Sequence, residues 1–125
     1  MILNILAVAF GGAIGSALRY FISLIPIKNL FPLQTFFTNL LGCFLIGIVT
    51  ALASVAAQKS SIKITPQMIL FLKTGICGGF TTFSTFALEN ANFITNKNPL
   101  FFALYAVASI FLGILCVFAG QNCIK

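Results

Sequence analysis

The segment GICGGFTTFSTF, residues 75–86, holds the side chains of this sequence that are best suited to contact an ion. It contains three glycines, three phenylalanines and four hydroxyl residues, and it carries no charge. Serine and threonine hydroxyls donate hydrogen bonds without a fixed charge, and the edges of phenylalanine rings carry partial positive charge. Such groups attract an anion, whereas none of them is a conventional acid or base catalyst.

The paired glycines of this segment predict a break in a helix. Gly78 and Gly79 have low helix propensity, and the branched Thr81 and Thr82 that follow crowd the backbone further. Irregular backbone at membrane depth is tolerated only inside protein or beside a watery cavity, and its free carbonyls can coordinate a cation. In a second interpretation, the spacing of Gly75 and Gly79 only lets another helix approach closely.

Two other apolar runs carry polar residues at helical spacing. Asn39 follows Thr35 by four residues and precedes Gly42 by three, so these residues share one helix face. Tyr105 and Ser109 are likewise four residues apart in the last run. Taken singly, each side chain needs no more than an interhelical hydrogen bond, worth about 0.6 kcal/mol in membrane bundles. Together they indicate polar faces on two further helices.

Ser84 lies between Phe83 and Phe86, and the three-residue spacing points both rings the same way if the helix resumes after the break. A lining of neutral donors and ring edges suits a small, strongly hydrated anion, because short donors replace its waters without holding it too tightly to leave. The alternative is that these polar faces only join helices to one another.

The elements that carry these residues are expected to cross a membrane. Of the 125 residues, 60% are hydrophobic and 6% are charged, and the mean hydropathy is +1.12. A bilayer core about 30 Å thick needs roughly 20 residues of helix. We predict one all-α integral membrane domain with its third helix broken near the middle. Its spans are expected at about residues 2–25, 33–57, 66–95 and 99–121.

The net charge of +6 reflects single basic residues near the helix ends rather than a clustered patch, so nucleic acid is not an expected partner. With four spans both termini share one side of the membrane. The basic residues then divide four against three: Lys59, Lys63, Lys73 and Lys125 against Arg19, Lys28 and Lys97. So small a bias permits insertion in both orientations, and it equally permits one orientation fixed by the extra lysine.

Catalysis and metal chelation by side chains lack their usual residues. The sequence has no histidine and one acid, Glu89, so it offers no acid–base pair, and we predict that the protein is not an enzyme. The four cysteines, Cys43, Cys77, Cys116 and Cys123, have no metal-ligand spacing. Arg19 either snorkels to the interface or adds positive potential near a pore mouth.

Three motifs resemble those of the Fluc (CrcB) fluoride channel family over essentially the whole chain. They are GGAIGSALRY at residues 11–20, TFFTNLLGCFLIG at residues 35–47 and GICGGFTTFSTF at residues 75–86. The resemblance implies an antiparallel, dual-topology homodimer with two fluoride pathways and a structural sodium ion at its centre. It also implies passive, selective fluoride conduction that exports fluoride across the cytoplasmic (inner) membrane.

The resemblance also assigns roles to residues of the third helix. The sodium ligands would be the backbone carbonyls of Gly78 and Thr81, supplied by both subunits around a two-fold axis. Phe83 and Phe86 would form an aromatic box along each pore. Ser84 would belong to the polar path of the anion.

Further roles fall on the other helices. Asn39 would be a pore donor, Thr35 part of the polar path, and Arg19 a residue near the pore entrance. Tyr105 and Ser109 match the polar track of the family on the fourth helix. One turn farther, where some relatives carry another serine, this sequence has Gly113.

Two other classes of function are open to a small membrane protein of this kind. A proton-coupled small multidrug exporter also uses short four-helix subunits in opposed orientations, but such exporters resemble one another in an acid on the first helix, which is lacking here. A purely structural membrane subunit would use its polar faces only to join helices, and it predicts no ion flux from the purified protein.

Overall fold

The computed structural model describes residues 1–58 and 63–124, and this part of the chain folds into helices without strands. Four helical stretches are long and apolar enough to cross a bilayer, the third of them being Pro66–Thr95. This confirms the prediction of an all-α protein with four spans. The elements are α1 (Ile2–Ser23), α2 (Leu33–Gln58), α3 (Pro66–Ile69), η1 (Leu70–Cys77), α4 (Gly78–Phe80), α5 (Phe83–Thr95) and α6 (Pro99–Asn122).

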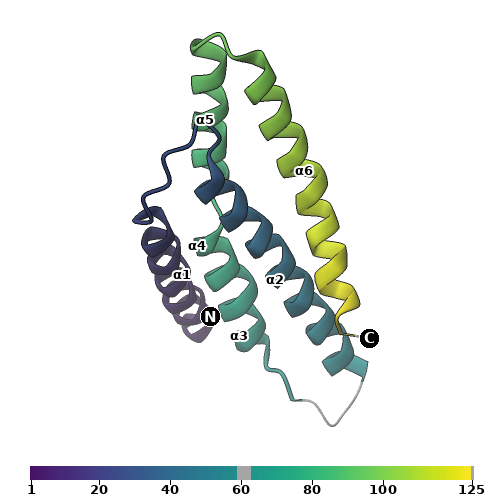
Figure 1. Cartoon of the computed structure of the whole chain (residues 1–125). Helices are drawn as coiled ribbons and strands as arrows, with labels where there is room; N and C mark the ends of the chain where they lie inside the picture. Colours follow the sequence, from purple (N-terminus) through teal and green to yellow (C-terminus); the bar gives the residue numbers. More distant parts are fainter. Residues whose placement is uncertain (59–62, 125) are drawn as a thin grey trace.

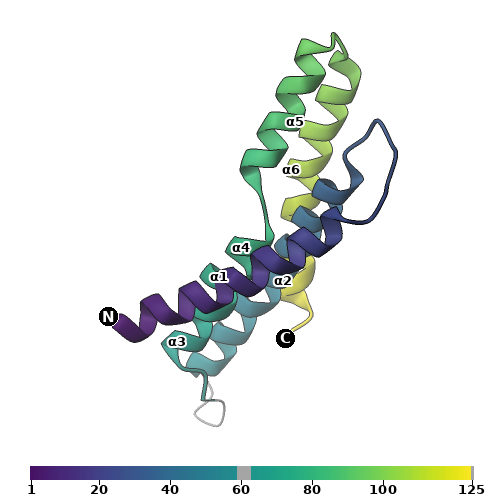
Figure 2. The same cartoon turned by 90° about the vertical axis from the view of Figure 1, so that its left-hand side faces the viewer.

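The third span is a chain of short elements in line. Its first residue is Pro66, whose fixed φ suits a helix start, and the Thr65 hydroxyl accepts a hydrogen bond of 3.3 Å from the Met68 N–H. The π-helix η1 follows and leads into α4. Beyond α4 the backbone stretches before α5 begins, and Figure 2 shows this link between the two helices plainly. The predicted break in the third helix is therefore confirmed.

The break lies at the threonines and not at the paired glycines, which corrects the expected position. Gly78 is helical, with φ −65° and ψ −38°. Thr81 and Thr82 are extended, with ψ values of 158° and 107°. Branched residues favour extended backbone, and the Thr82 hydroxyl caps α5 by accepting a 3.2 Å hydrogen bond from the Thr85 N–H. The break thus ends one helix and starts the next with its own cap.

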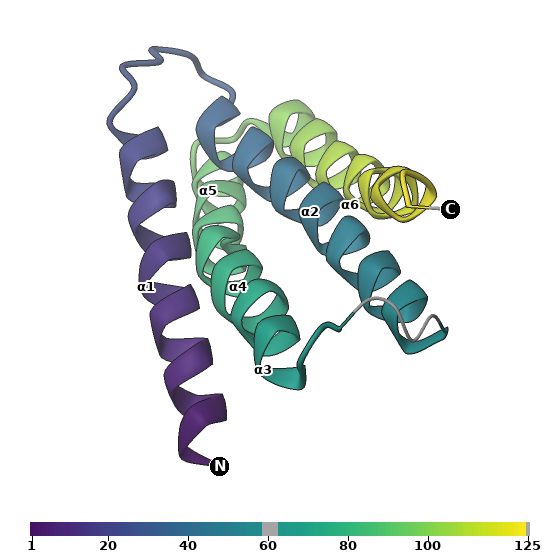
Figure 3. The same cartoon turned by 90° about the horizontal axis from the view of Figure 1, so that it is seen from below.

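The spans form two closely packed pairs that share the middle of the molecule. The helix α1 packs along η1 and α4, and α2 packs along α6 (Figure 1). Seen from below, α4 lies between α1 and α2, with α6 on the far side of α2 (Figure 3). After the break, α5 packs against α6, where the rings of Phe93 and Phe101 stack at a centroid distance of 5.8 Å. The break therefore lies where all spans meet.

Glycines set the close approach of α1 to the third span. A Cβ on Gly11 would stand 2.9 Å from the Cα of Gly75, and one on Gly79 would stand 2.6 Å from the carbonyl oxygen of Gly12. Both glycine pairs therefore pack two backbones together, as small residues do in membrane helices. Gly75 and Gly79 thus do allow a close approach, as the second interpretation held, but the third span is broken as well. The packing of Gly79 explains why it remains helical.

We expect Gly15→Ala to destabilise the protein and Gly12→Ala, its matched control, to leave it nearly unchanged. A Cβ at position 15 would collide with the carbonyl oxygen of Ile76 and stand 2.8 Å from the Phe80 N–H nitrogen, both backbone atoms that cannot swing aside. At Gly12 a Cβ would meet nothing within 4 Å in the described part of the chain. Overpacking typically costs about 1–3 kcal/mol. Thermal unfolding in detergent should separate the two variants, and equal melting temperatures would contradict this packing.

The charge comparison made from the sequence is only partly visible. Lys59 and Lys125 lie outside the described residues. Lys73 lies inside η1, seven residues beyond the start of the third span, and its side chain is exposed. It is thus not at a helix end, contrary to the simple picture of one basic residue at each end.

Candidate functional site

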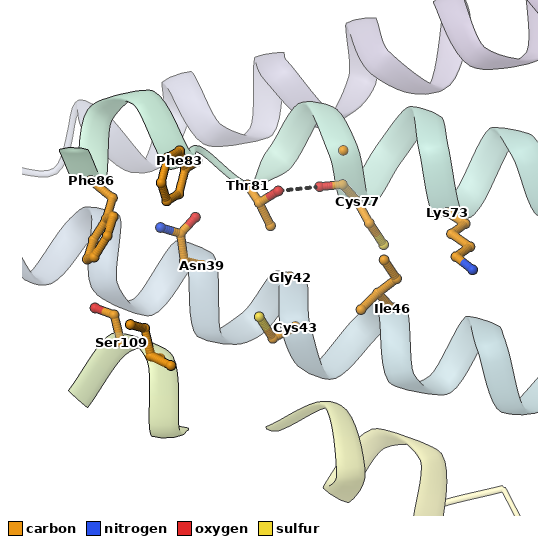
Figure 4. Close-up of a pocket in the computed structure, with 12 residues that line it drawn as sticks. Asn39, Gly42, Cys43, Ile46, Lys73, Cys77, Thr81, Phe83, Phe86 and Ser109 are labelled. Carbon is orange, nitrogen blue, oxygen red and sulfur yellow. Dashed lines mark hydrogen bonds between the residues drawn. The ribbon is translucent and has the colours of Figure 1, made fainter. Parts of the chain in front are cut away.

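A groove of about 330 Å³ opens where α2, α6 and both halves of the third span meet; we call it the central groove. Four predicted pathway side chains, from three different spans, line it, and so do both predicted carbonyl residues (Figure 4). These residues are Asn39, Phe83, Phe86, Ser109, Gly78 and Thr81. The structure therefore brings together most of the residues that the sequence singled out.

Asn39 stabilises the extended backbone at the break through hydrogen bonds to Thr82. Its Nδ2 donates a hydrogen bond of 3.2 Å to the carbonyl oxygen of Thr82, and its Oδ1 accepts one of 2.8 Å from the Thr82 N–H. One amide side chain thus satisfies two backbone groups that the break released, which membrane depth demands. Gly42, on the same face of α2, leaves room for the methyl group of Thr81. Asn39 and Gly42, on one face of α2, therefore both contact the extended residues of the break.

The aromatic rings and a free hydroxyl meet on the other side of the groove. The ring centroids of Phe83 and Phe86 are 5.8 Å apart, and that of Phe86 is 5.0 Å from Tyr105. The Ser109 Oγ is buried and has no hydrogen-bond partner among residues 1–58 and 63–124. A buried hydroxyl without a partner is costly, so the Ser109 hydroxyl, in the same groove as the Phe83 and Phe86 rings, marks a place for a ligand or water.

Ser84 lies on the exposed surface at the start of α5, where its hydroxyl is 3.4 Å from that of Thr82. The Thr82 hydroxyl also donates a 2.9 Å hydrogen bond to Thr85 Oγ1. These hydroxyls surround the first turn of α5. Ser84 is therefore close to the break but is not among the residues that line the central groove.

A second, smaller pocket of about 170 Å³ lies on the Arg19 side of the break; we call it the polar pocket. Thr35 lines it, so this predicted pathway residue is separated from Asn39 and the central groove. Arg19 lines it as well, and its Nε donates a hydrogen bond of 3.3 Å to the carbonyl oxygen of Gly79. Of the two interpretations of Arg19, the one that turns it toward the site fits this contact.

Glu89 connects Thr35 with Tyr105, a role that the sequence analysis missed. The Thr35 hydroxyl donates a 2.7 Å hydrogen bond to one carboxylate oxygen, and the fully buried Tyr105 hydroxyl donates one of 2.6 Å to the other. Tyr105 thus faces Glu89 rather than the central groove. The signal was present, because a single acid in an apolar span must find donors and these two hydroxyls lie on the polar faces.

The carbonyls of Gly78 and Thr81 are suited to a cation. Neither accepts a hydrogen bond in the described part of the chain, and a Cβ on Gly78 would have open space around it. Hard oxygen donors of this kind suit sodium. Among the described residues no group of three or more His, Cys, Asp or Glu side chains could hold a metal.

Comparison with known proteins agrees with this arrangement. The sequence model of the family described as "CrcB-like protein, Camphor Resistance (CrcB)" matches residues 6–121. The chain belongs to this CrcB family. Its match includes the break, the central groove and the polar pocket, so the site consists of residues that the family model covers.

Curated relatives of the chain carry the name "Fluoride-specific ion channel FluC". The protein of Chlorobium phaeobacteroides (strain DSM 266 / SMG 266 / 2430) is 40% identical over 117 residues, 92% of this chain and 87% of its own. That of Chlorobaculum tepidum is 41% identical over 119 residues, covering 94% and 90%. That of Flavobacterium psychrophilum is 38% identical over 120 residues, covering 94% and 93%.

We expect Glu89→Leu to destabilise the folded protein, because it leaves the Thr35 and Tyr105 hydroxyls without their acceptor. An unsatisfied buried hydroxyl costs about 1–3 kcal/mol. Glu89→Gln keeps a carbonyl oxygen for one of them and should fall between leucine and the natural residue. Thermal melts in detergent give the order; a leucine variant as stable as the natural protein would contradict the role assigned to these hydrogen bonds.

Proposed function

We propose that this protein is a fluoride-selective, passive ion channel of the cytoplasmic (inner) membrane. Its spans make it a multi-pass membrane protein, and the relatives it matches over nearly their whole length are named fluoride-specific ion channels. One observation carries the proposal for this chain: the Ser109 hydroxyl, which has no hydrogen-bond partner among the described residues, lies in the same groove as Asn39 and the Phe86 ring.

The chemistry of that groove favours fluoride. The anion loses waters as it enters, and a hydroxyl, an amide and ring edges offer neutral positive ends in their place. Their strength is sufficient to replace water yet insufficient to trap the ion, so it moves down its electrochemical gradient. Phe83, Phe86, Asn39 and Ser109 form this pathway, and such conduction needs no catalytic step.

We place Thr35, Ser84 and Tyr105 beside this pathway rather than in the central groove. Thr35 and Tyr105 hold Glu89, and Ser84 borders the break. Arg19 contributes positive charge on the polar-pocket side, which favours anions near the pore entrance. An anion that leaves the groove past the break therefore meets hydroxyls and the Arg19 guanidinium, with the hydrogen-bonded Glu89 carboxylate in the same pocket.

A proton-coupled exporter is disfavoured by the position of the acid. The helix α1 carries no acidic residue, and Glu89, the one acid in the sequence, is engaged by two hydroxyl donors. A proton-carrying carboxylate must exchange protons with water during transport. Glu89 is better suited to fixing Tyr105 and Thr35 in place.

The channel is proposed to be an antiparallel homodimer with two pathways. The Phe83 side chain is 78% exposed, and a Cβ on Gly78 would meet no atom within 4 Å in the described residues. In a single chain, the face that carries the break is therefore not covered by other helices. A second copy in the opposite orientation closes such a face symmetrically. The small difference in basic residues between the two sides is consistent with insertion in both orientations.

A structural sodium ion is proposed at the dimer centre. Gly78 and Thr81 of each subunit would hold it through their carbonyl oxygens, which are without hydrogen-bond partners in the described residues. The ion would supply positive charge and join the subunits. Purification with sodium replaced by N-methylglucamine should then lower the dimer fraction in cross-linking experiments, whereas an unchanged fraction would remove sodium from the account.

Fluoride release from liposomes tests the proposed function. The purified protein in vesicles loaded with potassium fluoride should discharge fluoride, detected by a fluoride electrode, once valinomycin lets potassium follow. Vesicles loaded with potassium chloride should retain their anion under the same treatment. Retained fluoride would support a structural subunit instead, and equal release of both anions would contradict selectivity.

A further inference from the structure

The central groove continues past Ser109 to a thiol. Cys43 lines it together with Ser109, and Figure 4 shows the Cys43 side chain between α2 and α6. Position 113, one helical turn beyond Ser109, is a buried glycine and presents no side chain. The Cys43 Sγ lies 3.4 Å from the point that a Cβ on Gly113 would occupy. The Cys43 thiol therefore lies next to the turn of α6 at which Gly113 has no side chain.

We propose that Cys43 is a pathway residue, with its thiol serving as the next donor after Ser109 along the fluoride path. This inference rests on the proposed function of the groove as that path. The Ser109 hydroxyl is buried and partnerless in the described residues, so an anion held there needs a further donor on the way out. In the groove beside it, Cys43 offers an S–H group whose sulfur lies next to the space left by Gly113.

The chemistry predicts how substitutions rank. An S–H group is a weak donor, whereas a serine hydroxyl at the same place is a stronger one and an alkyl group donates nothing. Cys43→Ser should conduct at least as well as the natural protein. Cys43→Val should conduct about three- to tenfold more slowly, because one hydrogen bond to the passing anion is lost.

A hydroxyl from the opposite side should compensate. Gly113→Ser places an Oγ on α6 close to the space that Cys43→Ala vacates, since the two positions are in van der Waals contact. The double variant should recover most of the flux that Cys43→Ala alone loses. Gly113→Ala in the same Cys43→Ala background is the control, because it refills the space without adding a donor. If Cys43 only packs, the alanine and serine double variants should recover the same flux.

Thiol capping tests the natural sequence without any substitution. Methyl methanethiosulfonate adds a small methylthio group to an accessible thiol and should slow fluoride release by the natural protein about tenfold, as the donor is lost and the groove narrows. Cys43→Ser should resist the reagent, whereas Cys77→Ala, which removes the other thiol that lines the groove, should remain sensitive. Cys116→Val, which removes a half-buried thiol of α6 outside the groove lining, should remain sensitive and serves as the matched control.

The outcomes separate this inference from the proposed function. If the natural protein releases fluoride but Cys43→Val and the capped protein release it at the natural rate, Cys43 is not on the path and the channel assignment stands. If the natural protein releases none, the proposed function fails first. Size-exclusion profiles identify a Cys43→Val variant that does not fold, and in that case the comparison of capped natural protein with Cys43→Ser decides alone.

Discussion

Exchanging Asn39 for leucine is expected to lower fluoride release by about a hundredfold. The change removes both hydrogen bonds to the Thr82 peptide, at 3.2 and 2.8 Å, and leaves two backbone groups unsatisfied inside the membrane. Each unsatisfied group costs about 1–3 kcal/mol, and each 1.4 kcal/mol corresponds to about tenfold in rate. The break should therefore close or shift, and the groove should lose a donor at the same time.

Asn92→Leu is the matched control for this change. Asn92 belongs to the same membrane domain, on α5, but its side chain is exposed and it lines neither the central groove nor the polar pocket. It should release fluoride at nearly the natural rate. Fluoride-electrode traces from equal amounts of each protein give the comparison, and an Asn39→Leu trace that matches the natural one would show that Asn39 is scaffold only.

Phe86→Ile is expected to reduce fluoride release by about tenfold while leaving assembly intact. Isoleucine keeps much of the apolar bulk but has no ring edge with partial positive charge, so the anion loses an attractive contact. A tenfold lower rate corresponds to about 1.4 kcal/mol. The Phe86 ring also packs on Tyr105, with a centroid distance of 5.0 Å. Its loss therefore also removes a packing contact between α5 and α6. Phe83→Ile should act in the same direction.

Phe111→Ile provides the control for the aromatic change. The Phe111 side chain is 66% exposed on α6 and does not line the central groove. Its replacement should alter neither release nor the size-exclusion profile. Natural rates in Phe83→Ile and Phe86→Ile, with the dimer retained, would remove both rings from the pathway.

The location of the break shows how far the sequence alone reaches. Low helix propensity and the polar composition of residues 75–86 predicted that the third span is interrupted there. Propensity is a weak prior, however, and tertiary packing decided the position: Gly79 packs against Gly12 and stays helical, while Thr81 and Thr82 take the extended conformation. The spacing of glycines within one helix does not show which residue of another helix each glycine will contact.

The same limit explains the division of the site. Four-residue spacing grouped Thr35 with Asn39 and Tyr105 with Ser109 on shared helix faces. It could not show that Thr35 and Tyr105 meet at Glu89 while Asn39 and Ser109 face the central groove. That division depends on how α2, α5 and α6 cross, which only the packed structure specifies.

Electrical recording tests selective anion conduction most directly. The purified protein is placed in a planar bilayer with sodium fluoride on one side and an equal concentration of sodium chloride on the other. We predict a current at zero applied voltage, carried by fluoride toward the chloride side, and a large reversal voltage of the sign set by fluoride. A reversal at zero voltage would mean that chloride and fluoride pass equally well, and it would contradict the account of the groove as a fluoride pathway.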